Sequence, residues 1–306
     1  MVSNSIKTLI VIAGPTACGK TALSVEIAKH LKTEILSADS RQFYHEMKIG
    51  TAAPDIEEQD GIKHHFIGHL SIHDDYNVSR YENDALACLK IIFQQSDFAI
   101  CTGGSGLYIR ALCNGIDNFP DIDPTLRESL NEQFKTQGIE SLRQQLKLLD
   151  PDYYHEVDLA NPMRLLRALE VCYTTGQAYS QQRTTPKHSR PFNILKIVIN
   201  RPREELFNRI NLRTNKMIDD GFLQEAESLF EFRQLNALNT VGYKELFAHL
   251  GNQMSLMDAV EKIKTNTRRY AKRQLTWFTR EDDYHWYNAD DKDEIIKFIE
   301  SNTTYV

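Results

Sequence analysis

One stretch of this 306-residue sequence combines glycines, a lysine and a threonine at the spacing of a phosphate-binding loop. It matches G-x-x-x-x-G-K-[ST] and consists of Gly14, Pro15, Thr16, Ala17, Cys18, Gly19, Lys20 and Thr21. The backbone N–H groups of such a loop and the helix that follows it attract phosphate oxygens, the lysine neutralises them, and the threonine hydroxyl can bind Mg²⁺. The pattern predicts a polyphosphate site and leaves the reaction open.

A carboxylate follows the next apolar run of the chain. Residues 34–38 predict a strand, and Asp39 comes directly after it, followed by Ser40, Arg41 and Gln42. The carboxyl ends of parallel strands meet at one edge of a sheet, so we expect Asp39 to face the phosphate loop as a metal ligand or a general base. The alternative is that Asp39 caps a following helix, because Asp and Ser are common N-cap residues.

The elements that must position these residues alternate between strands and helices. Apolar, β-branched runs at 8–13, 34–38, 98–102 and 194–200, with a helical pattern at 22–31, predict an α/β fold. We expect a P-loop NTPase-like parallel sheet flanked by helices. Residues beyond 203 predict helices up to Trp277 and a short closing strand near 285–287.

The middle of the chain has a different pattern. It predicts helices at 124–137, 139–149 and 163–175 and no convincing strand, so we expect a helical insertion domain at 114–190. The core domain would then comprise residues 1–113 and 191–306.

Composition limits the class of protein. Hydrophobic residues make up 41% and charged residues 25%, as in soluble globular proteins, and no apolar run approaches the ~20 residues that span a bilayer. The five cysteines are scattered without a Cys-x-x-Cys pair, which argues against a zinc site or a disulfide framework. We expect a cytoplasmic monomer without a signal peptide or membrane association.

A net charge of −6 requires any nucleic-acid surface to be a local basic patch. One candidate spans 262–280 without an acidic residue and contains Lys262, Lys264, Arg268, Arg269, Lys272, Arg273 and Arg280. Gln274, Trp277 and Phe278 lie among these cations and would suit unpaired RNA bases. The alternative is a helix with one basic face and one core face. Arg127, Arg164 and Arg167 add cations to the insertion.

Seven segments together resemble the tRNA dimethylallyltransferases, also called tRNA isopentenyltransferases. In the order of that family the chain contains GPTACGKT, SADSRQFYHEMKIGTAAP, HHFIGH, CTGGSGLYIRAL, NPMRLLRALEV, NTVGYKEL and KRQLTWF, which span nearly all of it. The resemblance implies that the loop holds the diphosphate of dimethylallyl diphosphate, with Mg²⁺ on Thr21. The acceptor would be the exocyclic N6 amine of the tRNA adenosine next to the anticodon (position 37), giving N6-isopentenyladenosine and diphosphate.

The resemblance also assigns roles to individual residues. Asp39 would take the proton of the amine, and Lys20, Thr21 and Mg²⁺ would stabilise the leaving diphosphate. Thr102, Ser105 and Arg213 would bind the diphosphate. Without the resemblance, the position of Arg213 on an amphipathic helix would favour a solvated surface residue. Contacts with the tRNA anticodon stem-loop would come from Asp39, Ser40, Arg41, Gln42, Ser105, Arg127, Met163, Arg164, Arg167, Asn239, Thr240, Val241, Gly242, Tyr243, Lys244, Lys272, Arg273, Gln274, Trp277 and Phe278.

The chain departs from the bacterial pattern at Asn239 and Lys244, where arginines are frequent. Because it has no metal-ligating Cys pair, we do not expect the C-terminal zinc finger of eukaryotic relatives. Four histidines, His64, His65, His69 and His73, could suggest a metal cluster, but we favour a loop that covers the site.

Three other functions share parts of the pattern. A small-molecule P-loop kinase would share the loop and sheet but not the basic C-terminal segment. A nucleotide-switched RNA-binding module would bind nucleotide without prenyl transfer. An adenine-nucleotide isopentenyltransferase would differ only in its acceptor.

Overall fold

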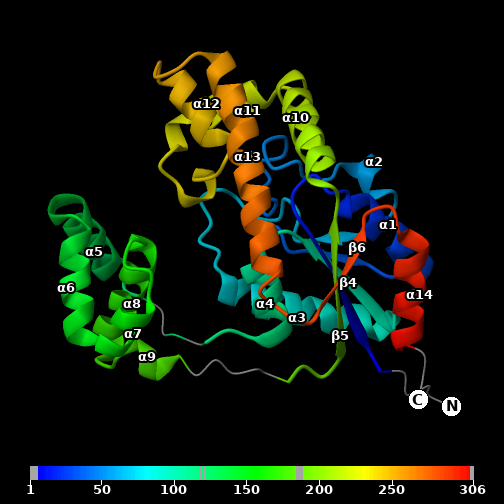
Figure 1. Ribbon diagram of the computed structural model, residues 1–306, viewed down its shortest axis with the longest axis horizontal. Coiled ribbons are helices and arrows are strands. Elements are labelled where there is room, and N and C mark those ends of the chain that lie inside the picture. The colour runs from blue at the N-terminus through cyan, green and yellow to red at the C-terminus, as the bar shows by residue number, and fades with distance from the viewer. Residues whose placement is uncertain (1–5, 118, 120–121, 184–188, 304–306) are drawn as a thin grey trace. The chain divides into compact units, whose positions relative to one another are not determined.

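The computed structural model describes residues 6–117, 119, 122–183 and 189–303 (Figure 1). Its sheet has the order β3-β2-β4-β1-β5-β6, and every neighbouring pair is parallel. The strands are β1 (Thr8–Ala13), β2 (Ile35–Ser37), β3 (His64–His65), β4 (Phe98–Gly103), β5 (Asn193–Asn200) and β6 (Tyr284–Asn288). The α/β prediction with a parallel sheet is confirmed, as are the runs at 8–13, 98–102 and 194–200.

The central strands are apolar because both of their faces are covered. In β1, Leu9 and Val11 belong to one buried cluster, whereas Ile10 and Ile12 belong to a second, and all four side chains are fully buried. Strands buried on both faces read as continuous apolar runs instead of alternating patterns. This is why the core strands could be located in the sequence.

The helices of the core unit are α1 (Lys20–Leu31), α2 (Ile56–Gln59), α3 (Val78–Gln95), α4 (Gly106–Asn114), α10 (Arg203–Asp219), α11 (Phe222–Ser228), α12 (Tyr243–Leu250), α13 (Leu256–Phe278) and α14 (Lys292–Thr303). Two 3-10 turns, η1 (Phe230–Phe232) and η2 (Asn236–Leu238), precede α12. Figure 1 shows α10, α11 and α12 beyond the end at which β5 points, whereas α13 runs from among them back alongside the sheet. The first three helices and the start of α13 therefore lie at the carboxyl edge of the sheet, where α/β proteins bind their ligands.

The histidine-containing segment differs from its predicted form. His64 and His65 form the edge strand β3 against β2, so they are part of the sheet and not of a covering loop. A two-residue strand is too short to show a periodic pattern. Among the described residues, no group of three or more His, Cys, Asp or Glu side chains could hold a metal ion.

Residues 114–188 form a second compact unit, separate from 1–113 and 189–306. Its helices are α5 (Pro124–Gln137), α6 (Ile139–Leu149), α7 (Pro151–Glu156), α8 (Pro162–Thr175) and α9 (Tyr179–Gln182). Its core includes the buried Leu142, Leu146, Leu165 and Leu169. The sequence placed the second boundary two residues later, at 190; residues 184–188, which it assigned to the insertion, lie outside the described residues.

Within the described parts of the chain, no helix has the length and apolar character needed to cross a membrane.

Candidate active site

The phosphate loop lies between β1 and α1, as predicted. Gly14 and Gly19 have φ of +157° and +103°, and a Cβ on Gly14 would lie 2.5 Å from the carbonyl oxygen of Ile199. Both positions therefore require glycine. The Lys20 ammonium donates to the Pro15 carbonyl at 3.0 Å, which places its charge over the loop.

Three arginines support the loop from outside. Arg213 donates to the Thr16 hydroxyl at 2.5 Å, Arg209 to the Ala17 carbonyl at 2.8 Å, and Arg201 to the Cys18 carbonyl at 2.9 Å. Arg209 and Arg213 lie one turn apart on α10, and the pair of Arg201 with Asp290 joins the loop to the segment after β6.

Arg213 is partly buried and not the solvated surface residue that its helical pattern suggested. Burial lowers the pKa of the Arg213 guanidinium, and the nearby Asp39 carboxylate opposes that shift. Arg213 thus brings a partly desolvated positive charge to the phosphate loop.

Asp39 follows β2 at the same edge of the sheet. Its Oδ1 accepts a hydrogen bond from the Arg41 N–H at 3.1 Å, which closes a turn. No helix begins there, so the helix-cap alternative is wrong. The Ser105 hydroxyl accepts from the Ser40 N–H at 3.1 Å, and so ties this turn to the loop after β4.

Thr102 lies at the end of β4, next to the loop. Its hydroxyl donates to the Ile12 carbonyl at 3.2 Å and accepts from the Ser24 hydroxyl at 2.9 Å. In this structure the Thr102 hydroxyl connects β4 to β1 and α1. Its contact with diphosphate stays a prediction.

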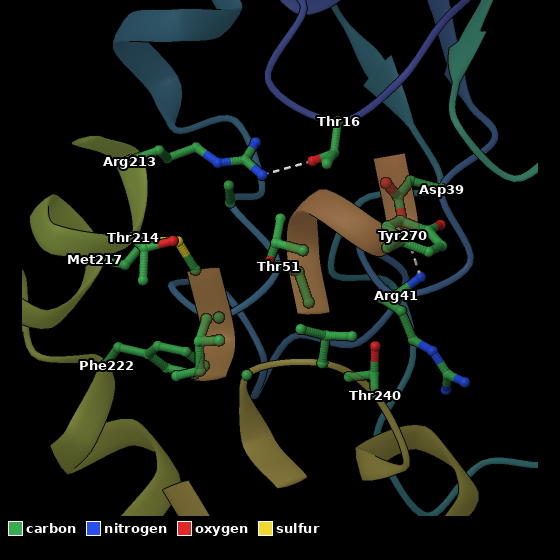
Figure 2. Close-up of a pocket in the computed structure, with 16 residues that line it drawn as sticks. Thr16, Asp39, Arg41, Thr51, Arg213, Thr214, Met217, Phe222, Thr240 and Tyr270 are labelled. Atoms are coloured by element: carbon green, nitrogen blue, oxygen red, sulfur yellow. Dashed lines mark hydrogen bonds between the residues drawn. The ribbon is translucent and has the colours of Figure 1, made fainter. Parts of the chain in front are cut away.

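Thr16, Asp39 and Arg213 line one cavity (Figure 2), whereas Lys20, Thr102 and Ser105 are not among the residues that line it. Thr16 and Arg213 line one part of it, and Asp39 and Tyr270 line another. The remaining lining residues are Arg41, Gly50, Thr51, Ala52, Thr214, Met217, Phe222, Thr240, Val241, Gly242, Ile263 and Thr267. Cations, a carboxylate and an apolar wall therefore share a single site.

Several of these lining residues were not singled out in the sequence. Met217, Phe222, Ile263 and Tyr270 belong to three different helices, so only the fold brings them together. Burial is the main cause that raises the pKa of the Tyr270 phenol, and the Asp39 carboxylate adds to it. Tyr270 consequently keeps its proton and can donate a hydrogen bond beside Asp39.

Comparison with known proteins identifies the family. The model of the IPP transferase family matches residues 42–281. A tRNA dimethylallyltransferase 1 of Bacteroides fragilis is 47% identical over 296 residues, which cover 97% of this chain and 98% of the relative. The chain belongs to the IPP transferase family. A tRNA dimethylallyltransferase of Christiangramia forsetii is 48% identical over 294 residues, 96% of this chain and 97% of its own.

Solved structures of the IPP transferase family have the same fold. The tRNA isopentenylpyrophosphate transferase of Bacillus halodurans has a TM-score of 0.73 and 32% identity over 97% of both chains. A eukaryotic dimethylallyltransferase acting on tRNA has a TM-score of 0.78 and 26% identity, covering 97% of this chain and 76% of that one. These likenesses do not favour a kinase, a nucleotide-switched RNA-binding module or a free-nucleotide transferase.

Not every side chain assigned to tRNA by resemblance to this family is exposed. Phe278 and Tyr243 are fully buried, Phe278 against Tyr284 and Tyr243 with its hydroxyl on Glu225. Phe278 cannot stack on a base in this structure, so that expectation is corrected, and the Tyr243 ring is not exposed to an RNA ligand. The apolar face of α13 and the start of α12 belong to the core.

Gln274 is also buried, and both ends of its amide are used. Its Oε1 accepts from the Thr16 N–H at 2.9 Å, and its Nε2 donates to the Gly104 carbonyl at 2.9 Å. The amide predicted to meet a base instead joins the phosphate loop to the loop after β4. Trp277 packs against that same loop, since a Cβ on Gly106 would lie 2.1 Å from its Nε1.

Arg41 and Gln42 likewise make internal contacts. Arg41 Nη1 donates to the Asn236 and Ala237 carbonyls, both at 2.9 Å, and Gln42 Nε2 donates to the Ala52 carbonyl at 3.1 Å. Asn239, Lys244, Lys272 and Arg273 are exposed. Thr240, Val241 and Gly242 line the cavity. The structure thus leaves the exposed residues and the cavity wall available for an RNA ligand.

In the 114–188 unit, two predicted cations share one carboxylate. Arg127 and Arg167 pair with Glu170 at 2.9 and 3.4 Å, and that carboxylate is 8% exposed. Met163 and Arg164, at the start of α8, are exposed. This unit therefore presents cations on its surface, two of which Glu170 partly neutralises.

Thr21 suits the Mg²⁺ that the family resemblance implies. Its hydroxyl lies in the first turn of α1, next to Lys20. Mg²⁺ is usually held by one or two protein oxygens together with substrate phosphates and water. An all-protein cage is not needed, so the Thr21 hydroxyl beside a phosphate loop is an adequate donor.

Proposed function

We propose that this chain transfers a dimethylallyl group from dimethylallyl diphosphate to the N6 amine of the adenosine next to the anticodon in tRNA. One observation carries the proposal: Thr16 of the phosphate loop, the Arg213 guanidinium, the Asp39 carboxylate and an apolar wall line one cavity. The names of the relatives, tRNA dimethylallyltransferases, support it. The likeness to a eukaryotic dimethylallyltransferase acting on tRNA supports the choice of acceptor.

The diphosphate end of the donor is bound by the loop. Backbone N–H groups, the Lys20 ammonium and the Arg213 guanidinium face the oxygens on which negative charge grows as the carbon–oxygen bond breaks. Thr21 would hold Mg²⁺ there, and the ion supplies further charge neutralisation. Binding that strengthens as charge grows on the leaving group lowers the barrier.

The amine end of the reaction is served by Asp39. The electron pair of the breaking C1–O bond leaves with diphosphate, N6 forms the new bond to C1, and the proton of N6 passes to the Asp39 carboxylate. The adenine amine is a weak nucleophile because its lone pair is delocalised into the ring. A base in contact with it is therefore valuable.

The acceptor adenosine has to leave its stacked position to reach this cavity, because Asp39 lies inside it. Thr240, Val241 and Gly242 of the cavity wall would contact the flipped base. The exposed Lys272, Arg273, Lys244 and Arg164 would contact tRNA phosphates, which is how basic side chains position nucleic acids.

Diphosphate release tests this proposal. With Mg²⁺ and dimethylallyl diphosphate, the wild type is expected to release diphosphate when unmodified tRNA is added and not when AMP is added. Asp39→Asn should reduce kcat by ~10²-fold or more while leaving the Kd for tRNA within about twofold. Release that does not depend on tRNA would reject the acceptor, and near-normal turnover of Asp39→Asn would reject Asp39 as the base.

A further inference from the structure

Apolar side chains line the cavity next to Thr16 and Arg213. Arg213, Thr214 and Met217 line the cavity from α10, and Met217 follows Arg213 by four residues, a rise of ~6 Å along the helix. Phe222, the first residue of α11, lies beyond Met217 (Figure 2). The chain thus places an apolar wall one turn away from the guanidinium that faces the diphosphate.

The Phe222 ring in this wall is fully buried and closely held. A Cβ on Gly50 would lie 2.3 Å from Phe222 Cε2, and a Cβ on Gly242 would lie 2.8 Å from its Cζ. The ring also makes an edge contact with Tyr243, at 5.1 Å between centroids. Two glycines are needed here because the backbone on either side approaches the ring closely.

A partly buried carboxylate, that of Glu225, fixes the segment on one side of the ring. Glu225 accepts hydrogen bonds from the Ile49 and Gly50 N–H groups, both at 2.8 Å, and from the Tyr243 hydroxyl at 2.6 Å. Because Glu225 lies one turn after Phe222 on α11, the same helix supplies the ring and holds its surroundings. These bonds hold Gly50 and Tyr243, which both contact the ring, in place beside it.

We propose that Phe222 sets the length of the prenyl group that this chain accepts. The inference rests on the proposed function. A donor whose diphosphate lies at Thr16 and Arg213 directs its hydrocarbon chain along α10 past Met217, and the Phe222 ring ends the available space after one isoprene unit. Geranyl diphosphate, which is longer by a second unit, meets the ring. An added carbon in a closed apolar pocket typically changes specificity by about 10- to 200-fold.

The test compares the two donors on one tRNA. For wild type, Phe222→Leu and Phe222→Ala, kcat/KM is measured with dimethylallyl and with geranyl diphosphate. The ratio of kcat/KM with geranyl diphosphate to kcat/KM with dimethylallyl diphosphate is expected to rise by about 10-fold or more in Phe222→Ala and by less in Phe222→Leu. Phe222→Leu retains most of the apolar volume, so it keeps the test valid should the alanine variant fail to fold.

Phe247→Ala is the matched control. Phe247 is a buried phenylalanine of the same cluster, near Tyr243, but it is not among the residues that line the cavity. The ratio of kcat/KM for the two donors in Phe247→Ala should equal that of the wild type. An unchanged ratio in folded Phe222 variants, or an equal rise in Phe247→Ala, would overturn the inference, as would loss of both donors in a folded Phe222→Leu. Failure of the wild type to use dimethylallyl diphosphate at all would instead reject the proposed function.

Discussion

Gln274 joins two loops of the site through one side-chain amide. The phosphate loop contributes the Thr16 N–H, and the loop after β4 contributes the Gly104 carbonyl. A Cβ on Gly104 would lie 2.0 Å from Gln274 Nε2, so a larger residue there would displace the amide from its present position. A single residue of α13 thereby sets the spacing between two segments that lie far apart in the chain.

Replacing Gln274 should weaken both the fold and the donor site. Gln274→Ala leaves one N–H and one carbonyl without their partner, and each loss costs about 1–3 kcal/mol of unfolding free energy. The KM for dimethylallyl diphosphate should also rise, since the loop loses its support. Urea denaturation and steady-state kinetics measure the two effects. Gln234→Ala, at an exposed turn, should change stability by less than about 0.5 kcal/mol.

The sequence revealed site residues that act within a local motif and missed those that the fold assembles. The phosphate loop and Asp39 were predicted because their spacing carries the chemistry. Arg209, Tyr270 and Phe222 look like ordinary helical residues in the sequence, and only the fold shows that they contact or line the site. Phe278 and Gln274 were assigned to RNA from the cations around them and from the family resemblance, whereas the structure buries both side chains inside the core unit.

At the scale of elements, α10 is the main support of the donor site. It presents Arg209 and Arg213 to the loop and Met217 to the cavity, all from a helix that follows β5 after a short turn. Residues spaced by four positions share one helix face, so the cations and the apolar wall form a continuous stripe.

Arg209→Ala tests this role of α10. The Ala17 carbonyl would lose its charged donor, and Ala17 already has an unfavourable φ of +66°. We expect the KM for dimethylallyl diphosphate to rise by about 10-fold with a smaller change in kcat, consistent with a lost hydrogen bond to a charged group.

The matched variant on the same helix is Arg203→Ala. Arg203 is exposed, with its guanidinium over the Phe207 ring at 5.2 Å. Its removal should leave the KM unchanged. Equal effects of the two substitutions would mean that α10 acts through its overall charge and not through the contact at Ala17.

Helices and strands were predicted correctly from the sequence where their apolar or periodic segments are long, and were missed where these segments are short. The β-branched runs gave β1, β4 and β5, and helix periodicity gave α5, α6 and α8 to within one residue. β3 and the one-turn helices α2 and α9 are set by tertiary contacts, such as the pairing of Ile35 with His64. No local pattern in the sequence encodes such pairings.

At the scale of the whole molecule, an acidic chain carries its cations in two separate units. The net charge is −6, yet α13 of one unit exposes Lys272 and Arg273, and α8 of the other exposes Arg164. Each unit has its own buried core, so substitutions on one surface should leave the other unit intact.

Arg164→Ala should therefore weaken the binding of tRNA without changing the binding of dimethylallyl diphosphate. If Arg164 neutralises one phosphate, the slope of log Kd against log salt concentration should fall by about 0.7–0.9, with the KM for dimethylallyl diphosphate unchanged. Filter binding across a salt series measures the slope. Lys135→Ala, an exposed cation of α5 in the same unit, is the control. An equal loss of slope in both variants would show that only the total charge of the unit matters.

The location of the transferred carbons tests the central claim most directly. Purified protein is mixed with Mg²⁺, dimethylallyl diphosphate labelled in its hydrocarbon part, and unmodified tRNA, with ATP and AMP as parallel acceptors. The tRNA is then digested to nucleosides. The account predicts label in a single nucleoside with the mass of N6-isopentenyladenosine. Label in the free nucleotides, or in neither acceptor, would contradict it.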